Sequence, residues 1–462
     1  MNSLMKSKSV KTVLCTVLSA ALLAAAPMQA LATSSHSSHN PRLKNVILMI
    51  SDGCGYNEIK AADYYQYGQT GLQVYEKFPV QYAMSTYSIG SYDPIAAWAS
   101  FNYAKTAPTD SAAAATAMST GVKTYDAGIG VDLNKQSLKH ISQRFEELGR
   151  STGVVTTVEI SHATPAGFVA HNASRNNYSD IANEMIMASA TDVIMGAGNP
   201  WYDDNGAKRA SAGSYQYVGG QEIWDGLVTG KLAAADADGD GKSDPWKLIQ
   251  TRDEFKKMAT GKTPDRVIGI AQAYTTLQQA RGGDGKAEPY KTALNKNVPT
   301  LAEMSNAALN VLDNDRDGFF LMIEGGAVDW AGHANQSGRM IEEEIDFNKA
   351  VDAVYKWVEK NSNWNETLLV VTGDHETGYL TGQGSNPGWA AVTNNGKGKL
   401  PGMQWNSGDH TNNLVPLYAK GAASYLFKSY ADEEDYFLGE YIDNTEIAKL
   451  LFKALEGARK GR

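Results

Sequence analysis

The stretch "NVILMISDG", residues 45–53, decides the fold class of this 462-residue chain. Its first part, "NVILMI" (45–50), is short and apolar without alternation, and it ends at a polar turn. Three other segments share this character: "GVVTTV" (153–158), "GFFLMI" (318–323) and "TLLVVT" (367–372). Continuous apolar runs rich in β-branched or large residues are typical of strands covered on both faces of a parallel sheet.

Helical patterns separate these strands. The segment "LKHISQRFEELG" (138–149) ends at a glycine, and 342–361 begins with acids and spaces Val351, Val354 and Val358 by three and four residues. Strands alternating with helices predict an α/β fold: a mostly parallel, doubly wound sheet covered by helices on both faces. The expected domain spans residues 45–462.

The first 32 residues are predicted to be a secretory signal peptide. Three lysines precede the apolar run 12–26, and Ala30-Leu31-Ala32 fits a small-x-small cleavage site. Residues 33–44 are expected to form a flexible leader. The apolar run is short for a membrane span, and no second one follows it. A periplasmic or secreted protein that does not bind a membrane is therefore expected.

The net charge and the number of cysteines exclude some classes of function and a disulfide. The formal net charge is −9, and loss of the three lysines of residues 1–32 makes it −12. Such an acidic protein is a poor candidate for binding nucleic acid. An anionic substrate would need local positive charge from metals or an arginine. Cys54 alone remains after cleavage, so no internal disulfide can form.

Two regions are rich in turn-forming residues: 196–297 is rich in Gly, Asp and Lys, and 378–408 is rich in Gly and Asn, lacks periodicity and is expected to form an ordered loop over one edge. Residues 196–297 are interpreted as an elaborated insertion on the main sheet, and 313–324 match the EF-hand spacing. The latter is rejected as a calcium loop because residues 319–323 read as a strand. The stretch 236–247 is left with two interpretations, a calcium loop or a solvated acidic turn, because Lys247 replaces the usual twelfth-position acid. Its candidate ligands are Asp236, Asp238, Asp240 and Asp244.

Three of the apolar runs end in carboxylates. Asp52 follows the first, Glu324 the third, and the adjacent pair Asp374-His375 the fourth. In open α/β sheets ligands bind beyond the carboxyl ends of the strands. Acids gathered there would repel one another unless cations lay between them. Acids also start many ordinary loops, so a single case means little, whereas three cases indicate a metal site.

Further carboxylate and imidazole groups fit such a site. Asp329 and His333 in "EGGAVDWAGHAN" are spaced i, i+4, which puts them on one face of a helical turn. The segment "SGDHTNN" adds His410, whereas His140 lies on a predicted helix and is expected at the surface. Carboxylate and imidazole ligands suit zinc. The D-x-x-x-H spacing alone is common by chance and gains weight only from the neighbouring acids.

The Ala-rich stretch "TAPTDSAAAATAMSTG", residues 106–121, is expected to open a helix at Ser111. Its hydroxyl would be either a plain N-cap or, beside a metal, a nucleophile near the positive helix end. In "SHATPAGFVAHNASR", Arg175 could clamp a tetrahedral oxyanion, although alone it would read as a surface arginine. The same stretch carries His162 and Thr164, which could serve a third cation.

Taken together, these motifs resemble the alkaline phosphatase family over essentially the whole mature chain. The matching segments are "ILMISDGCG", "PTDSAAAATAMSTG", "ISHATPAGFVAHNASR", "FFLMIEGGAVDWAGHAN", "VVTGDHETG" and "GDHTNN". The resemblance implies a phosphomonoesterase of broad substrate range and alkaline optimum, acting on small phosphate monoesters through a phosphoserine. It also implies two zinc ions and one magnesium ion per chain and a homodimer, with residues 378–408 near the interface or the active-site rim.

The resemblance assigns roles residue by residue. Ser111 would attack phosphorus, and Arg175 would hold the phosphoryl oxygens. The first zinc would be bound by Asp329, His333 and His410. The second would be bound by Asp374, His375 and Asp52. Asp52 would also bridge to the magnesium site, which includes Thr164 and Glu324.

The chain departs from the enterobacterial members at two positions: they carry aspartate where His162 stands and lysine where Trp330 stands. His162 is therefore expected beside the third site, whose metal is left open. Runner-up functions are a phosphodiesterase of the same superfamily, a sulfatase, or a protein that binds metal or phosphate without turnover. The context "TDSAAAA" lacks the Pro-x-Arg that a sulfatase nucleophile requires.

Overall fold

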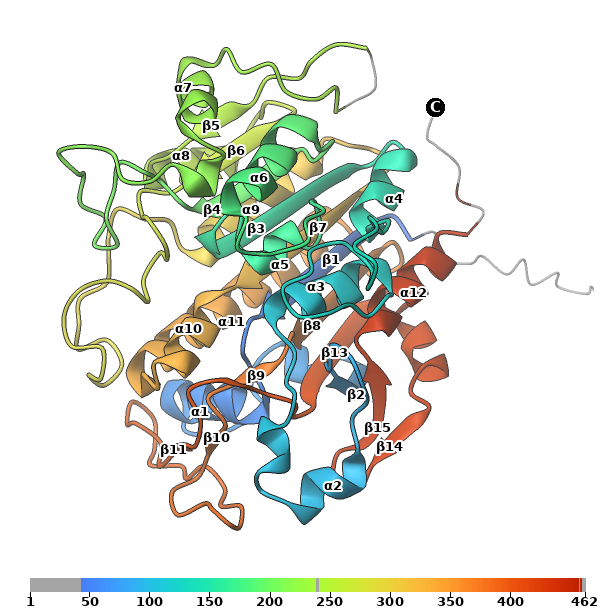
Figure 1. The fold of residues 1–462 in the computed structure, drawn as a ribbon, viewed down its shortest axis with the longest axis vertical. Coiled ribbons are helices and arrows are strands. Elements are labelled where there is room, and N and C mark those ends of the chain that lie inside the picture. Colours follow the sequence, from blue (N-terminus) through green and yellow to red (C-terminus); the bar gives the residue numbers. More distant parts are fainter. Residues whose placement is uncertain (1–42, 238–240, 457, 459–462) are drawn as a thin grey trace, which may run out of the picture. The chain divides into compact units, whose positions relative to one another are not determined.

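A computed structural model describes residues 43–237, 241–456 and 458. The predicted signal peptide, and the leader as far as residue 42, lie outside the described residues; Leu43 is already buried. Figure 1 shows the described residues arranged around one large sheet of eleven strands. None of the helices in these ranges combines the length and apolarity needed to cross a membrane.

The four predicted strands form the centre of this sheet in the order β8, β1, β7 and β3, and all three pairings are parallel. Almost every residue in them is buried, as their unalternating apolar sequences require. Their bounds are β1 Asn45–Ser51, β3 Ser151–Glu159, β7 Phe319–Gly325 and β8 Thr367–Gly373.

The sheet continues at both edges. Beyond β3 all strands are parallel, whereas beyond β8 the strand β13 is antiparallel to both neighbours, so the sheet is mostly parallel but mixed. The first edge holds β4 Val193–Ala197, β6 Val267–Ile270 and β5 Lys247–Ile249. The second holds β13 Val415–Gly421, β2 Val80–Ser85, β15 Gly439–Asp443 and β14 Glu433–Asp435.

Helices cover both faces, which confirms the predicted fold class. Alternate residues of β1 enter two separate hydrophobic cores: Val46 and Leu48 join one, Ile47 and Met49 the other. The first core is covered by α3 Ser111–Thr120, α4 Ile141–Glu147, α5 Ala163–Ala166 and α12 Thr445–Ala454. The second is covered by α1 Tyr56–Tyr67, α9 Leu301–Leu312, α10 Ala327–His333 and α11 Ser337–Asn361.

Two predicted helices differ in extent. The segment predicted at 138–149 is helical only from Ile141 to Glu147, and the helix predicted from residue 342 begins at Ser337. His140 precedes α4 and is fully buried, stacked on His171 with ring centroids 4.4 Å apart, so its assignment to the surface is wrong. The prediction rested only on its place in a helical pattern, whereas the segments that hold Gly130 and His171 lie against its ring.

The remaining elements lie at the sheet's ends and edges. Within residues 196–297, β5 and β6 extend the main sheet and α7 and α8 pack beside them. These helices are α7 Gln221–Thr229 and α8 Arg252–Met258, and two others are α2 Pro94–Ala99 and α6 Tyr178–Asn183. Two small antiparallel pairs complete the list: β9 Glu376–Thr377 with β12 His410–Thr411, and β10 Leu380–Thr381 with β11 Gln404–Trp405.

Candidate active site

Three adjacent parallel strands bring their terminal acids to one edge of the sheet. Asp52 follows β1, Glu324 lies near the end of β7, and Asp374 follows β8; all three are fully buried. Both carboxylate oxygens of Asp52 and of Glu324, and Oδ2 of Asp374, accept no hydrogen bond from the described residues. Burial has the largest effect and raises the pKa of Asp52, and repulsion from Asp374 raises it further. Buried carboxylates of this kind stay ionised only where a cation lies beside them, which makes this edge a candidate metal site.

A second group is formed by α10 and β12. The Nε2 atoms of His333 and His410 lie 3.0 Å apart, and each is 3.3–3.4 Å from Oδ1 of Asp329. Their Nδ1 atoms face the carbonyls of Gly408 and Thr109 at 2.8 Å, which makes Nδ1 the protonated nitrogen. The Nε2 lone pairs therefore converge. Ligands of a tetrahedral zinc with bonds of 2.0–2.1 Å lie about 3.3 Å apart, so the triangle has the right size.

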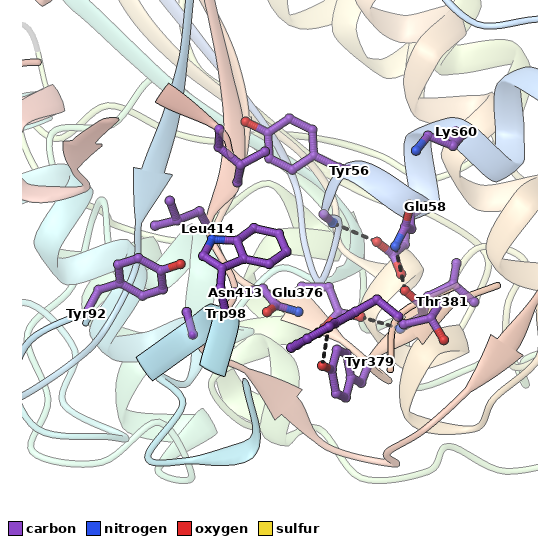
Figure 2. Close-up of a pocket in the computed structure, with 16 residues that line it drawn as sticks. Tyr56, Glu58, Lys60, Tyr92, Trp98, Glu376, Tyr379, Thr381, Asn413 and Leu414 are labelled. Atoms are coloured by element: carbon purple, nitrogen blue, oxygen red, sulfur yellow. Dashed lines mark hydrogen bonds between the residues drawn. The ribbon is translucent and has the colours of Figure 1, made fainter. Parts of the chain in front are cut away.

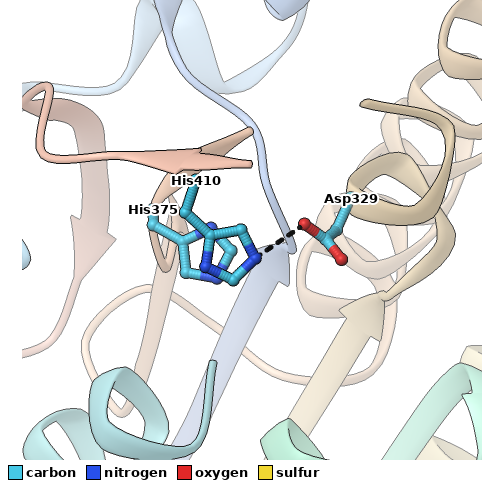
Figure 3. Close-up of side chains that lie close together, drawn as sticks. All are labelled: Asp329, His375 and His410. Atoms are coloured by element: carbon cyan, nitrogen blue, oxygen red, sulfur yellow. Dashed lines mark ion pairs between the residues drawn. The ribbon is translucent and has the colours of Figure 1, made fainter. Parts of the chain in front are cut away.

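His375 joins this group to the acids. Its Nε2 lies 3.3 Å from Oδ2 of Asp374 and 3.6 Å from Oδ1 of Asp52. The other oxygen of Asp374 accepts the amides of Gly53 and His375, each at 3.0 Å, so Oδ2 is left for a ligand. The His375 ring stacks on that of His410, with centroids 3.7 Å apart, and Figure 3 shows Asp329 facing both rings. The two predicted zinc ligand sets are thus contiguous.

Ser111 is the first residue of α3 and is buried. The helix is capped by Asp110, whose side chain accepts the amide of Ala113 at 2.9 Å. The capping interpretation of Ser111 is therefore wrong, because the preceding residue caps the helix. The Ser111 Oγ is instead 3.2 Å from Nε2 of His375, at the edge of the metal-ligand cluster.

Arg175 is held toward the same place by two contacts. Its Nη1 donates to Oδ2 of Asp110 and its Nη2 donates to Nε2 of His162, each at 3.1 Å. A guanidinium has only donors, so His162 must accept through Nε2. The side chain is 19% exposed, so Arg175 is neither a free surface arginine nor fully enclosed.

The side chains predicted for the third metal site also lie close together. One ligand atom each of Asp52, His162 and Glu324 lies within 4.8 Å of the others. Thr164 in α5 is fully buried beside them, and its hydroxyl has no partner among the described residues. Burial raises the pKa of Glu324 to about 7 and lowers that of His162 to about 3, with Arg175 adding to the latter effect. His162 therefore belongs to this cluster, and its Nε2 accepts the hydrogen bond from Arg175.

Sequence reasoning missed one side chain that contacts a predicted ligand. The hydroxyl of Thr377 donates to Oδ1 of Asp329 at 2.6 Å and lies 3.3 Å from Nδ1 of His375. Thr377 ends β9, two residues beyond His375, and a hydroxyl residue so close to a candidate ligand was the available signal.

Two of the four acidic candidates of the insertion belong to the described residues. Asp238 and Asp240 fall outside the described residues. Asp236 accepts the amide of Gly241, and Asp244 accepts that of Ala237. The rejected EF-hand match overlaps β7, which directs Glu324 to the cluster.

Comparison with known proteins now decides the family: the family model "Alkaline phosphatase" matches residues 43–401. The chain belongs to the alkaline phosphatase family. Alkaline phosphatase 3 of Bacillus subtilis (strain 168) is 29% identical to it over 93% of this chain and 92% of that protein. Members of this family are phosphomonoester hydrolases, and this chain is an enzyme of that class.

Solved structures of alkaline phosphatases have the same fold. That of the Antarctic bacterium TAB5 is 26% identical, with a TM-score of 0.61, and covers 90% of this chain and 99% of its own. A histidine-to-aspartate variant of the TAB5 enzyme, described with Mg bound in the M3 site, gives a TM-score of 0.60 at 26% identity, covering 90% and 98%. Candidate metal sites built from His, Asp and Glu are therefore expected in this chain.

Proposed function

We propose that this phosphomonoesterase acts through a phosphoserine formed on Ser111 beside two zinc ions and one magnesium ion. The observation that carries the proposal is the group of buried carboxylates of Asp52, Glu324 and Asp374, each with at least one oxygen that accepts no hydrogen bond from the described residues, close to the convergent imidazole nitrogens. Removal of these charges from water is unfavourable unless cations neutralise them.

The residues present fit the three metals. One zinc would be held by Asp329, His333 and His410, and the other by Asp374, His375 and Asp52, as the ligand distances of 3.0–3.6 Å allow. Magnesium would be held by Asp52, Glu324 and Thr164, because it prefers oxygen ligands. Bound there, such cations would lower the pKa of hydroxyl groups and neutralise charge developing on phosphoryl oxygens.

The chain's own residues would then perform two displacements. The Ser111 Oγ loses its proton and attacks phosphorus, the bond from phosphorus to the ester oxygen breaks, and the alcohol leaves with a proton from water. In the second step water attacks the phosphoserine and loses a proton, the bond from phosphorus to Oγ breaks, Oγ takes up a proton to restore the Ser111 hydroxyl, and inorganic phosphate leaves. Arg175, oriented by Asp110 and His162, would bind two phosphoryl oxygens through its remaining N–H groups. The amides that begin α3 favour the same anion.

The decisive experiment combines metal analysis with three substrates. Purified protein should contain zinc by elemental analysis and hydrolyse p-nitrophenyl phosphate far faster than bis(p-nitrophenyl) phosphate or p-nitrophenyl sulfate. Ser111→Ala should retain the metals and lose monoester hydrolysis by several orders of magnitude, while Ser119→Ala, in the same helix, should retain it. Near-normal activity in Ser111→Ala protein would refute the mechanism, and a preference for the diester would favour the phosphodiesterase alternative.

The contact between Ser111 and His375 also suggests a metal-free alternative, in which the imidazole acts as general base. Chelation separates the two mechanisms. Under the present proposal chelation abolishes activity, and zinc with magnesium restores more of it than magnesium alone. Full activity in metal-free protein would instead support the serine–histidine pair.

We further propose that the protein is exported to the periplasm or medium, from the signal-peptide pattern of residues 1–32. A homodimer and an alkaline optimum are proposed from family membership. Amino-terminal sequencing of protein recovered outside the cytoplasm, sedimentation of the pure enzyme and a pH profile test these three points separately.

A further inference from the structure

A pocket of about 270 Å³ opens beside the β9–β12 pair, on the face opposite the metal-ligand cluster. In this pair His410 is opposite Thr377, and Thr411 is opposite Glu376. Because strand side chains alternate between faces, His410 and Thr377 point toward Asp329. On the other face Thr411 donates to Glu376, which lines the pocket. The pocket is thus distinct from the proposed catalytic centre, although it shares two strands with it.

The walls of the pocket are aromatic. They are formed mainly by Tyr56, Tyr92, Trp98, Tyr379 and Trp389, as Figure 2 shows for the residues that it labels. The polar atoms of four of these rings are already engaged. Trp98 Nε1 and the Tyr92 hydroxyl both donate to the buried Asp435, and Trp389 Nε1 donates to the Tyr379 hydroxyl, which donates to a backbone carbonyl. These bonds fix the rings before any ligand arrives, which reduces the entropy lost on binding.

Two carboxyl groups complete the lining. Glu58 is 1% exposed; its Oε2 accepts the amide of Gly55, and its Oε1 has no hydrogen-bond partner among the described residues. Glu376 is also buried and accepts from Leu380 and Thr411. Lys60 lines the same pocket, yet within the described part of the chain no ion pair joins it to either acid. Burial, and then repulsion from the neighbouring Glu376, raise the pKa of Glu58, so this pair of buried acids lacks a compensating positive charge.

We propose that this pocket binds an organic ammonium cation, such as an alkylated amine, with its charge beside Glu58 and its alkyl groups against the aromatic rings. An ammonium group supplies the positive charge that the buried carboxylate lacks. The faces of Trp and Tyr attract such a cation, and the attraction grows when water is excluded. A divalent metal ion binds through several oxygen ligands, and the five aromatic rings of the pocket would not coordinate it. A neutral ligand would leave the repulsion between Glu58 and Glu376 uncompensated.

The test is isothermal titration of the purified full-length protein with choline, with sodium chloride replaced so that ionic strength stays constant. The matched probe is 3,3-dimethyl-1-butanol, in which an uncharged tert-butyl group replaces the trimethylammonium group. We expect saturable binding of one choline per chain, and affinity for the alcohol lower by roughly tenfold or more. Equal affinity for both probes, or no saturable heat with choline, would overturn the proposal.

Variants locate the binding. Glu58→Gln keeps an acceptor for the Gly55 amide and removes the charge, so choline affinity should fall roughly tenfold. Trp98→Leu removes a ring, leaves Glu58 and Glu376 unchanged and should also weaken the binding of choline more than that of the alcohol. Glu222→Gln, at an exposed position of α7, should bind choline like the parent. Unchanged affinity in both pocket variants would refute the site. Because binding is measured without substrate, this result is independent of the proposed hydrolysis.

Discussion

Thr377→Val tests whether the hydrogen bond from Thr377 to Asp329, a proposed zinc ligand, raises the affinity of the protein for zinc. The Thr377 hydroxyl donates at 2.6 Å to Oδ1 of Asp329, the same oxygen that lies 3.3–3.4 Å from the Nε2 atoms of His333 and His410. Valine has nearly the same shape, so the substitution removes the hydrogen bond and leaves no cavity. Thr377 is fully buried, and water cannot replace the missing donor.

The expected magnitude follows from that single bond. A hydrogen bond to a charged group contributes about 1.5–3 kcal/mol. At about 1.4 kcal/mol for each factor of ten, its loss corresponds to roughly 10- to 100-fold weaker zinc binding, if the bond matters only when the metal is bound. Because Thr377 touches no phosphoryl group in this proposal, activity at saturating zinc should be largely retained.

The assay is recovery of p-nitrophenyl phosphate hydrolysis by metal-free protein across a series of buffered zinc concentrations. The half-saturating zinc concentration should rise by the factor above for Thr377→Val. Thr377→Ser, which keeps the hydroxyl, should remain close to the parent. If the valine variant recovers at the parent's zinc concentration, Thr377 does not orient Asp329. If it stays inactive at saturating zinc, its role is not confined to metal affinity.

Three further predictions concern other contacts. Asp110→Asn presents an amide to Arg175 in place of a carboxylate; since both side chains are about one-fifth exposed, inorganic phosphate should inhibit roughly fivefold more weakly, and an unchanged inhibition constant would contradict this. Glu324→Gln should raise the magnesium concentration needed for activity while elemental analysis finds unchanged zinc; loss of zinc would show that the sites are not separable. His171 faces only acceptors; burial lowers its pKa, but the bonds to Glu184 and a carbonyl outweigh burial and raise it above 6.5. The stabilisation is therefore full below about pH 6.5 and lost as pH rises through the folded-state pKa, so His171→Gln should cost about 1–2 kcal/mol in free energy of unfolding at pH 6 and less at pH 9; a pH-independent cost in urea melts would contradict it.

The sequence was most informative where one residue's environment is set by its own neighbours. The run at residues 45–50 is apolar at successive positions because both faces of β1 are covered, and the same holds for β7 and β8. The carboxylates that follow these strands could then be placed at one edge without knowledge of any long-range contact.

Contacts between distant segments could not be predicted in this way. The sequence around His140 does not indicate that its ring will be buried against His171. Whether Asp110 or Ser111 caps the helix depends on the backbone conformation with which the chain enters α3. The aromatic pocket likewise draws on α1, the segment before α3 and the region after β8, which only packing brings together.

The amino-acid order by itself predicted the α/β class, which the structure confirms, the edge of the sheet where the acidic side chains meet and, through family motifs, the proposed ligand set. Only the tertiary structure decided which nitrogen of each histidine faces inward, because the carbonyl that fixes His410 belongs to Thr109, 301 residues away. Local pattern specifies burial and periodicity. Orientation depends on hydrogen-bond partners that come close only when the whole chain has folded.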